Sequence, residues 1–199
     1  MAENVRLIII SGCSGSGKTT LMNNLRQNNG FSFLKTVITR SKRDSDPEGD
    51  CDYISVEEFR NQVVAGKIVL PTEVSGNHYG IYYQQFEEAL NGERIYVRSV
   101  TPNNFADYYE LAGDKVIFLY IELSDIERGV NRMLERGDMT NEAILQRIRD
   151  EKYWNQKVDE LIDQGLPIFK LSSIDQARTL SEAQAALDFV QTELNEAQC

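Results

Sequence analysis

The sequence predicts an α/β fold of three layers, in which helices cover both faces of a central, mainly parallel sheet. Residues 5–11 form a continuous apolar run with three successive isoleucines, which is typical of a strand buried on both faces of such a sheet. Further strand-like runs alternate with helical segments along the chain. The 199 residues suit one compact domain, and the sequence contains no internal repeat, low-complexity tract or linker.

The elements of the first part of the chain follow from local signals. After the strand at 5–11, we expect a helix over 19–28 and a second strand over 31–39. Residues 40–52 are polar, charged and aperiodic, which predicts a loop. A Ser-x-x-Glu capping box then predicts a helix from residue 55 to about residue 65.

The second part of the chain continues the alternation. Short strand-like runs over 68–82 are interrupted at a Ser-Gly-Asn turn, and a helix over 84–90 ends at Asn-Gly. Two apolar strands are expected over 95–100 and 116–121, with a helix beginning near Pro102 between them. The remaining predicted elements are helices over 124–137 and 141–162, a strand over 167–171 and an amphipathic helix from residue 181 onward.

Composition excludes several classes of protein. The formal net charge of -10, spread along the chain, disfavours binding to polyanionic nucleic acid, although a local cationic cleft would still bind a small phosphorylated ligand. The cysteines at positions 13, 51 and 199 fit neither a disulfide framework nor a zinc site. The N-terminal apolar run is too short for a signal sequence or a membrane span. We therefore expect a cytoplasmic protein without nucleic-acid or membrane partners.

Residues 12–19 fit the phosphate-binding pattern G-x-x-x-x-G-K-[ST] at every fixed position. The glycines let successive backbone N–H groups point at phosphate oxygens, and the following helix adds its positive N-terminal dipole. In this P-loop, Lys18 is expected to reach the β- and γ-phosphates of ATP, and the Thr19 hydroxyl to coordinate Mg²⁺. The predicted ATP-binding residues are Gly12, Cys13, Ser14, Gly15, Ser16, Gly17, Lys18, Thr19 and Thr20.

Three further motifs follow the P-loop in a fixed order. They are T-V-I-T-R-S-K-R at 36–43, G-D-C-D-Y-I-S-V-E-E-F at 49–59 and S-G-N-H-Y-G at 75–80. This combination resembles the guanylate kinase family, in which T-T-R-x-x-R, G-x-D-Y-x-F-x-x-x-x-x-F and S-G-N-x-Y-G follow a P-loop. The order and spacings hold from residue 5 to about residue 147, with one extra residue between Arg43 and Tyr53.

The resemblance implies which residues bind the acceptor. In that family two arginines and two tyrosines bind the acceptor's phosphate, and a hydroxyl contacts its base. Guanidinium groups bind phosphate oxygens bidentately, and tyrosine hydroxyls add neutral donors. The matching positions in this sequence are Thr36, Arg40, Arg43, Tyr53 and Tyr79.

The resemblance also implies a lid that closes over ATP. The segment R-M-L-E-R-G at 132–137, followed by Arg147, matches the family's lid arginines. Such arginines stabilise the charge on the equatorial oxygens of the transferring group in the transition state. The candidate catalytic residues are therefore Lys18, Arg132, Arg136 and Arg147.

The positions that contact guanine in the family are changed in this chain. One acidic residue of the family precedes S-G-N-x-Y-G by five residues, and this chain has Leu70 at that position. The family motif L-D-I-D aligns with residues 97–100, so that Arg98 and Val100 replace its two carboxylates. Ile81 replaces a small hydroxylated residue. Losing two acidic partners should remove most discrimination in favour of guanine. Glu73 is a candidate substitute, so GMP stays a possible acceptor.

The resemblance implies a P-loop kinase fold: a three-layer α/β/α core with a central parallel sheet, a small mixed acceptor-binding insert and a helical lid. Within a single domain over 1–199, we expect the core at 1–35, 95–131 and 153–199, the insert at 36–94 and the lid at 132–152.

The expected function is transfer of the ATP γ-phosphate, with Mg²⁺, to a nucleoside monophosphate, either GMP or another ribo- or deoxyribonucleotide. One alternative is a sugar-phosphate kinase resembling ribose 1,5-bisphosphokinases. Another is a non-catalytic module like the guanylate-kinase-like domains of scaffold proteins. Catalysis is favoured because the chain retains Lys18, Thr19, Arg136 and Arg147. The expected partners are ATP and a small phosphorylated acceptor, bound to a monomer or a homodimer.

Overall fold

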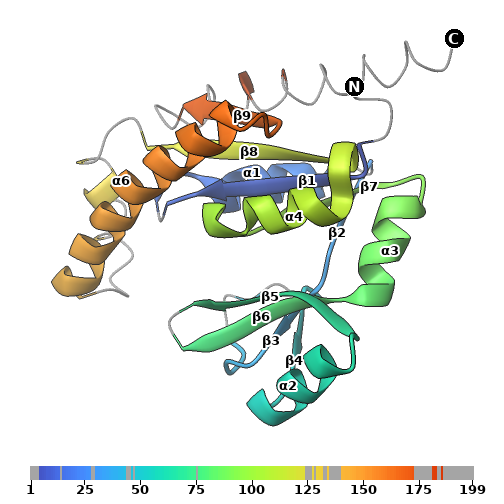
Figure 1. Ribbon diagram of the computed structural model, residues 1–199. Coiled ribbons are helices and arrows are strands. Elements are labelled where there is room, and N and C mark those ends of the chain that lie inside the picture. Colours follow the sequence, from blue (N-terminus) through green and yellow to red (C-terminus); the bar gives the residue numbers. More distant parts are fainter. Residues whose placement is uncertain are drawn as a thin grey trace, which may run out of the picture.

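The structure of the chain, a computed structural model, contains two sheets that lie one above the other in Figure 1. The described residues are 5–13, 15–27, 30–43, 46, 48–74, 76–123, 127, 129–131, 134, 140–172, 181–182 and 185.

The larger sheet has five parallel strands in the order β2-β7-β1-β8-β9. These strands are β1 (Leu7–Gly12), β2 (Phe31–Phe33), β7 (Ile95–Ser99), β8 (Val116–Glu122) and β9 (Ile168–Ser172). Strand β1 is the central one and is buried along its whole length, as its run of isoleucines predicts.

Alternation along β1 divides the core into two apolar layers. Leu7 and Ile9 belong to one buried cluster, which also contains residues of α4 (Phe105–Ala112) and α6 (Asn141–Asp163). Ile8 and Ile10 belong to a second cluster, with residues of α1 (Lys18–Arg26). Because successive side chains of a strand point to opposite faces, the sheet is covered by helices on both sides. The predicted three-layer α/β/α core with a central parallel sheet is confirmed.

The smaller sheet is mixed, with strands in the order β4-β3-β6-β5. Its strands are β3 (Thr36–Ile38), β4 (Cys51–Tyr53), β5 (Ile68–Val74) and β6 (Asn77–Tyr82). Strands β5 and β6 form an antiparallel hairpin, while β3 pairs in parallel with β4. Helix α2 (Val56–Val64) connects β4 to β5, and α3 (Tyr83–Asn91) leads back to β7 of the larger sheet.

The single strand predicted over 31–39 is wrong. Residues 31–33 pair with β7 in the larger sheet, whereas residues 36–38 pair with β4 and β6 in the smaller one. Leu34 lies between the two strands and is buried in the cluster of α4 and α6, which interrupts the strand without interrupting the apolar pattern. The loop predicted over 40–52 also ends earlier than expected, because β4 begins at Cys51.

Several other elements agree closely with the predictions made from the sequence. Helix α2 begins after Ser55, whose hydroxyl accepts a hydrogen bond from the Glu58 backbone N–H at 3.1 Å, as the capping box predicts. The helix expected near Pro102 is a short 3₁₀ turn, η1 (Pro102–Asn104), followed by α4. The helices predicted over 124–137 and from residue 181 onward lie largely outside the described residues.

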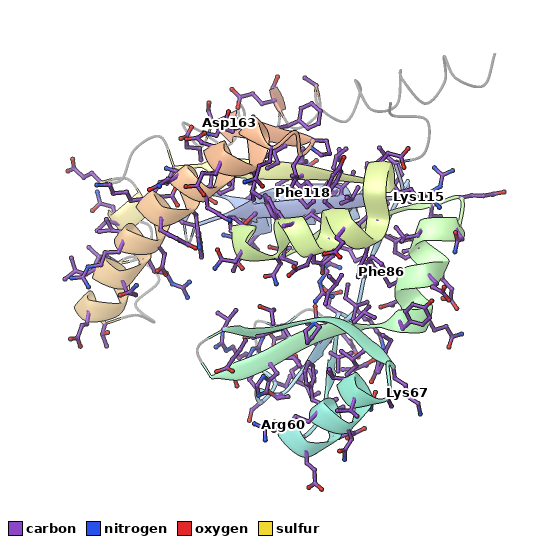
Figure 2. The ribbon with its side chains drawn as sticks, in the orientation of Figure 1. Arg60, Lys67, Phe86, Lys115, Phe118 and Asp163 are labelled. Atoms are coloured by element: carbon purple, nitrogen blue, oxygen red, sulfur yellow. The ribbon has the colours of Figure 1, made fainter. Side chains whose placement is uncertain are left out.

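One apolar cluster joins the two sheets. Leu70 of β5, Ile81 of β6 and Phe86 of α3 are buried in the same cluster as Leu7 and Phe118 of the larger sheet. Figure 2 labels Phe86 and Phe118, and Phe86 also packs edge-on against Tyr108 of α4 with ring centroids 6.4 Å apart. Within the described part of the chain, no helix combines the length and apolarity needed to cross a membrane.

Candidate active site

The P-loop connects β1 to α1, with its glycines in conformations that other residues rarely adopt. Gly12, Gly15 and Gly17 have φ angles of 142°, 86° and 103°. A Cβ atom at Gly12 would lie 2.5 Å from the backbone oxygen of Ile121, so a side chain there would push the loop away from β8. The motif is therefore folded as a tight turn against the carboxyl end of the sheet. Ser14, which was predicted to bind ATP, lies outside the described residues.

Lys18 and Thr19 begin helix α1 directly after this loop. The Lys18 ammonium donates hydrogen bonds to the carbonyl oxygens of Gly12 and Cys13, at 2.6 and 2.5 Å. Thr19 is exposed in the first turn of the helix. The Lys18 side chain thus lies over the P-loop, where the backbone N–H groups of such a loop would face a bound phosphate.

A cavity of about 420 Å³ lies beside the P-loop and is lined by residues from both sheets. Six residues predicted from the sequence line it together: Gly12, Lys18, Thr36, Arg40, Tyr79 and Arg147. The other lining residues are Ile38, Cys51, Thr72, Val74, Arg98, Ser99, Val100, Thr101, Asn104 and Trp154. Predicted ATP-binding, acceptor-binding and catalytic residues therefore share one space.

Charge is distributed unevenly around this cavity. Its lining contains four cations, Lys18, Arg40, Arg98 and Arg147, and no Asp or Glu is among its described lining residues. A cavity of this kind attracts phosphate groups despite the net negative charge of the chain. Arg132 and Arg136, the other predicted lid arginines, lie outside the described residues.

The predicted acceptor-phosphate residues meet at Asp46, a residue that the sequence analysis missed. Arg40 donates two hydrogen bonds to the Asp46 carboxylate, at 2.6 and 2.7 Å, and the Tyr53 hydroxyl donates a third at 2.7 Å. The backbone N–H of Arg43 donates to the same carboxylate at 2.8 Å, while the Arg43 side chain is exposed. Asp46 therefore holds Arg40 and Tyr53 in fixed positions.

Electrostatics around Asp46 agree with this geometry. The Arg40 hydrogen bonds hold the pKa of the Asp46 carboxyl well below its usual range, with a smaller contribution from Tyr53. Burial, followed by the bond to Asp46, raises the pKa of the Tyr53 hydroxyl, which stays a neutral donor at physiological pH. The hydrogen bonds to Asp46, with a smaller contribution from Tyr79, raise the pKa of the Arg40 guanidinium. The group is therefore an ion pair of Arg40 with Asp46, flanked by the hydroxyls of Tyr53 and Tyr79.

The positions expected to contact a base are divided between the cavity and the core. Val100 and Arg98 line the cavity, whereas Leu70 and Ile81 are buried in the apolar cluster that joins the sheets. Leu70 has a left-handed φ of 52°, at a break in the pairing of β5 with β6 between Val69 and Thr72. Leu70 is therefore not among the residues that line the cavity, whereas Thr72 of the same strand is.

Glu73 does not supply the missing guanine-contacting carboxylate, and His78 does not supply a general base. Glu73 is 62% exposed, and its carboxylate lies 3.9 Å from Nδ1 of His78. The His78 ring stacks on Phe59, with centroids 5.5 Å apart. Neither residue is among those that line the cavity, so the suggested replacement of a guanine-contacting acid by Glu73 has no support in the geometry.

Glu151 of α6 is a second residue that the sequence analysis missed. Its side chain is 3% exposed, and its Oε1 atom accepts a hydrogen bond from the backbone N–H of Leu123 at 3.1 Å. Burial, and then the nearby Glu151 carboxylate, raise the pKa of the Cys13 thiol well above its usual range, so this P-loop cysteine is no nucleophile. Glu151 thus connects the helix of Arg147 to the residue after β8 and to the P-loop.

We predict that Glu151→Ala lowers the free energy of unfolding by about 2–3 kcal/mol, since it leaves the buried Leu123 N–H without an acceptor and opens a void. Urea denaturation measures the change. The control is Glu160→Ala on the same helix, where the exposed carboxylate accepts only from Gln156, and the change should stay within about 0.5 kcal/mol. Equal effects of the two substitutions would contradict the structural role of Glu151.

Comparisons with known proteins place this site in context. The family model described as guanylate kinase matches residues 4–164. The guanylate kinase of Clostridium tetani is 30% identical over 148 residues, which are 74% of this chain and 71% of that protein. The guanylate kinase of Porphyromonas gingivalis is 29% identical over 147 residues, which are 72% of this chain and 78% of that protein.

A solved structure agrees at the level of the fold. The crystal structure of guanylate kinase from Anaplasma phagocytophilum matches with a TM-score of 0.71 at 18% sequence identity. The match covers 96% of this chain and 87% of that one, so it extends over both sheets.

Proposed function

Because this chain belongs to the guanylate kinase family and is an ATP-dependent phosphotransferase, we propose that it phosphorylates a nucleoside monophosphate held in the cavity beside the P-loop. The observation that supports the proposal most directly is the composition of that cavity. It brings Lys18 of the P-loop together with Arg40 and Tyr79 of the smaller sheet and with Arg147 of α6. Donor and acceptor phosphates would meet between these groups.

The residues suit phosphoryl transfer between two phosphates. The acceptor's phosphate oxygen is already anionic, so no general base is needed, and the task of the protein is to position the groups and to neutralise charge. In our proposal Arg40, Tyr53 and Tyr79 bind the acceptor phosphate, while Lys18 binds the phosphates of ATP. Arg147, together with Arg132 and Arg136, would stabilise the charge of the transferring group.

The site also suits a magnesium ion. The Thr19 hydroxyl is exposed beside the P-loop, and the described residues contain no group of three or more His, Cys, Asp or Glu placed to hold a metal. Mg²⁺ is commonly bound by one or two protein groups and by substrate phosphates, so this arrangement fits it. We propose that Thr19 holds Mg²⁺, which would neutralise phosphate charge when bound with ATP.

We further propose the division of the chain into a core (1–35, 95–131 and 153–199), an acceptor-binding insert (36–94) and a lid (132–152). The smaller sheet, which contributes Thr36, Arg40 and Tyr79 to the cavity, supports the insert. A cytoplasmic location, a monomeric or homodimeric state and the absence of nucleic-acid partners are also proposals. They rest on the use of ATP, on a cysteine content that fits no disulfide framework and on the net charge of -10.

One observation favours a second candidate, a kinase of sugar phosphates. The described lining of the cavity has four cations and no carboxylate, so the side-chain acceptors that it offers to the N–H groups of guanine are neutral oxygens, such as those of Thr36, Ser99 and Asn104. An acceptor without a base, but with a second phosphate, would satisfy the same cations. We keep the nucleoside monophosphate as the leading acceptor because of the family relationship.

We predict that GMP is preferred over other acceptors by less than a hundredfold. A larger preference would require about 2.7 kcal/mol, more than a single neutral hydrogen bond supplies, and the described lining contains no carboxylate. The measurement is kcat/KM for GMP, AMP, UMP, dTMP and ribose 1,5-bisphosphate under identical conditions, with the Lys18→Ala variant as a blank for contaminating kinases. A GMP preference above a hundredfold would contradict the prediction, and transfer to none of these acceptors would contradict the proposed function.

A further inference from the structure

Arg98 of β7 has a buried positive charge without an anionic partner. Its side chain is 5% exposed, although it lines the cavity. No described Asp or Glu forms an ion pair with it, and the cavity lining described here contains no carboxylate. A buried charge without a counter-ion is costly, and proteins tolerate such groups chiefly where a ligand compensates them.

The hydrogen bonds of Arg98 leave part of its guanidinium unused. Nη1 donates to the Lys35 carbonyl and Nη2 to the Gly80 carbonyl, each at 3.1 Å. The buried Nε has no partner in the part of the chain that the structure describes. A guanidinium has five N–H donors, so three remain after these two bonds. The two carbonyls fix the orientation of the group but do not neutralise it.

The position of Arg98 separates it from the acceptor-phosphate residues. It is bonded to the carbonyl of Lys35, immediately before β3, and to that of Gly80, which pairs with Val37 of β3, whereas Arg40 follows the end of β3. Three to five residues of extended chain span roughly 10–15 Å. Arg98 is therefore anchored beside the first half of β3 and Arg40 beyond its end, and both line the same cavity. A single acceptor that contacts both needs an oxygen at each end.

We propose that Arg98 binds an oxygen atom at the end of the acceptor remote from its phosphate, and so selects acceptors that carry one there. The inference rests on the proposed function, because it presumes a phosphorylated acceptor in this cavity. A guanidinium donates well to the O6 and N7 atoms of guanine or hypoxanthine, whereas adenine presents an amino group in place of O6. A second phosphate on a sugar would supply the same oxygen chemistry.

The same lining predicts that the 2-amino group of guanine contributes little to binding. That group needs an acceptor, and in the family the acceptor is a carboxylate, whereas the described lining of this cavity offers only neutral side-chain oxygens, whose hydrogen bonds are weaker. GMP and IMP differ only in this amino group. The enzyme should therefore bind GMP and IMP about equally, and both more tightly than AMP.

The test measures equilibrium dissociation constants of GMP, IMP and AMP, and of ribose 1,5-bisphosphate and ribose 5-phosphate, by calorimetry. For the unmodified protein we expect GMP and IMP to bind about tenfold more tightly than AMP, or the bisphosphate to bind about tenfold more tightly than the monophosphate. In Arg98→Met, whichever of these two affinity ratios exceeds one in the unmodified protein should fall close to one. Each preference is a ratio within one protein preparation, so a partial loss of folded protein does not change it.

The matched control is Arg94→Met, which makes the same substitution just before the same strand. Arg94 is exposed, contacts Ser32 and does not line the cavity, so both ratios should stay as in the unmodified protein. Ratios that Arg98→Met leaves unchanged would overturn the inference, as would a GMP preference over IMP of more than about tenfold. Binding with these ratios but without phosphoryl transfer would overturn the proposed function alone.

Discussion

Replacing Lys18 by alanine is expected to lower kcat by at least about a hundredfold while the protein stays folded. Lys18 lines the cavity and its ammonium lies over the P-loop, bonded to the carbonyls of Gly12 and Cys13. When phosphates enter, the ammonium has only to turn from these carbonyls to the phosphate oxygens. Removing a preorganised charge that stabilises the transition state typically costs a factor of a hundred to a thousand.

Coupled-assay kinetics with ATP and the best acceptor of the panel measure this effect, and circular dichroism checks the fold. The matched control is Lys67→Ala, in which an exposed lysine between α2 and β5, labelled in Figure 2, is removed. That variant should keep the activity of the unmodified protein. Turnover in a folded Lys18→Ala protein that equals the unmodified rate would show that ATP binds elsewhere.

Arg40→Ala is expected to weaken acceptor binding by about ten- to a hundredfold and to leave ATP binding nearly unchanged. Arg40 lines the cavity from the smaller sheet, and hydrogen bonds to charged groups contribute about 1.5–3 kcal/mol. The substitution also leaves the Asp46 carboxylate without its main partner, which adds a negative charge near the acceptor's phosphate. Arg43→Ala should act in the same direction, since its guanidinium is free to move toward a bound phosphate.

Separate titrations with acceptor and with an unreactive ATP analogue distinguish the two sites. The control is Arg60→Ala, on the outer side of α2 and labelled in Figure 2, where neither affinity should change. If Arg40→Ala weakened binding of the ATP analogue and left acceptor binding intact, the assignment of the smaller sheet to the acceptor would be wrong.

Features encoded in consecutive residues could be predicted from the sequence. The P-loop is one of these, because the glycines, Lys18 and the buried strand before them are adjacent in the chain. The helix cap at Ser55 is another. The division of residues 31–39 between two sheets could not be predicted, because Leu34, whose side chain is buried in the core, continues the apolar pattern between β2 and β3.

Features that depend on contacts between residues distant in the sequence could not be predicted, because no local pattern encodes them. Asp46 lies in an aperiodic loop, and only the folded chain brings its carboxylate to Arg40 and Tyr53. Glu151 belongs to a helix with many charged residues, and its burial is decided by the packing of that helix against Leu123 and the P-loop. The substitution at Arg98 was visible in the sequence, but its bonds to the Lys35 and Gly80 carbonyls were not.

The apolar cluster that joins the two sheets has a consequence for how the chain folds. The cluster that supports the larger sheet also buries Leu70, Ile81 and Phe86. The smaller sheet therefore has no separate hydrophobic core of comparable size among the described residues. The buried cluster within the smaller sheet and α2 consists of Val37, Phe59 and Ile68. The two sheets therefore form one cooperative unit, in which local unfolding of the acceptor side would expose apolar surface of the nucleotide side as well.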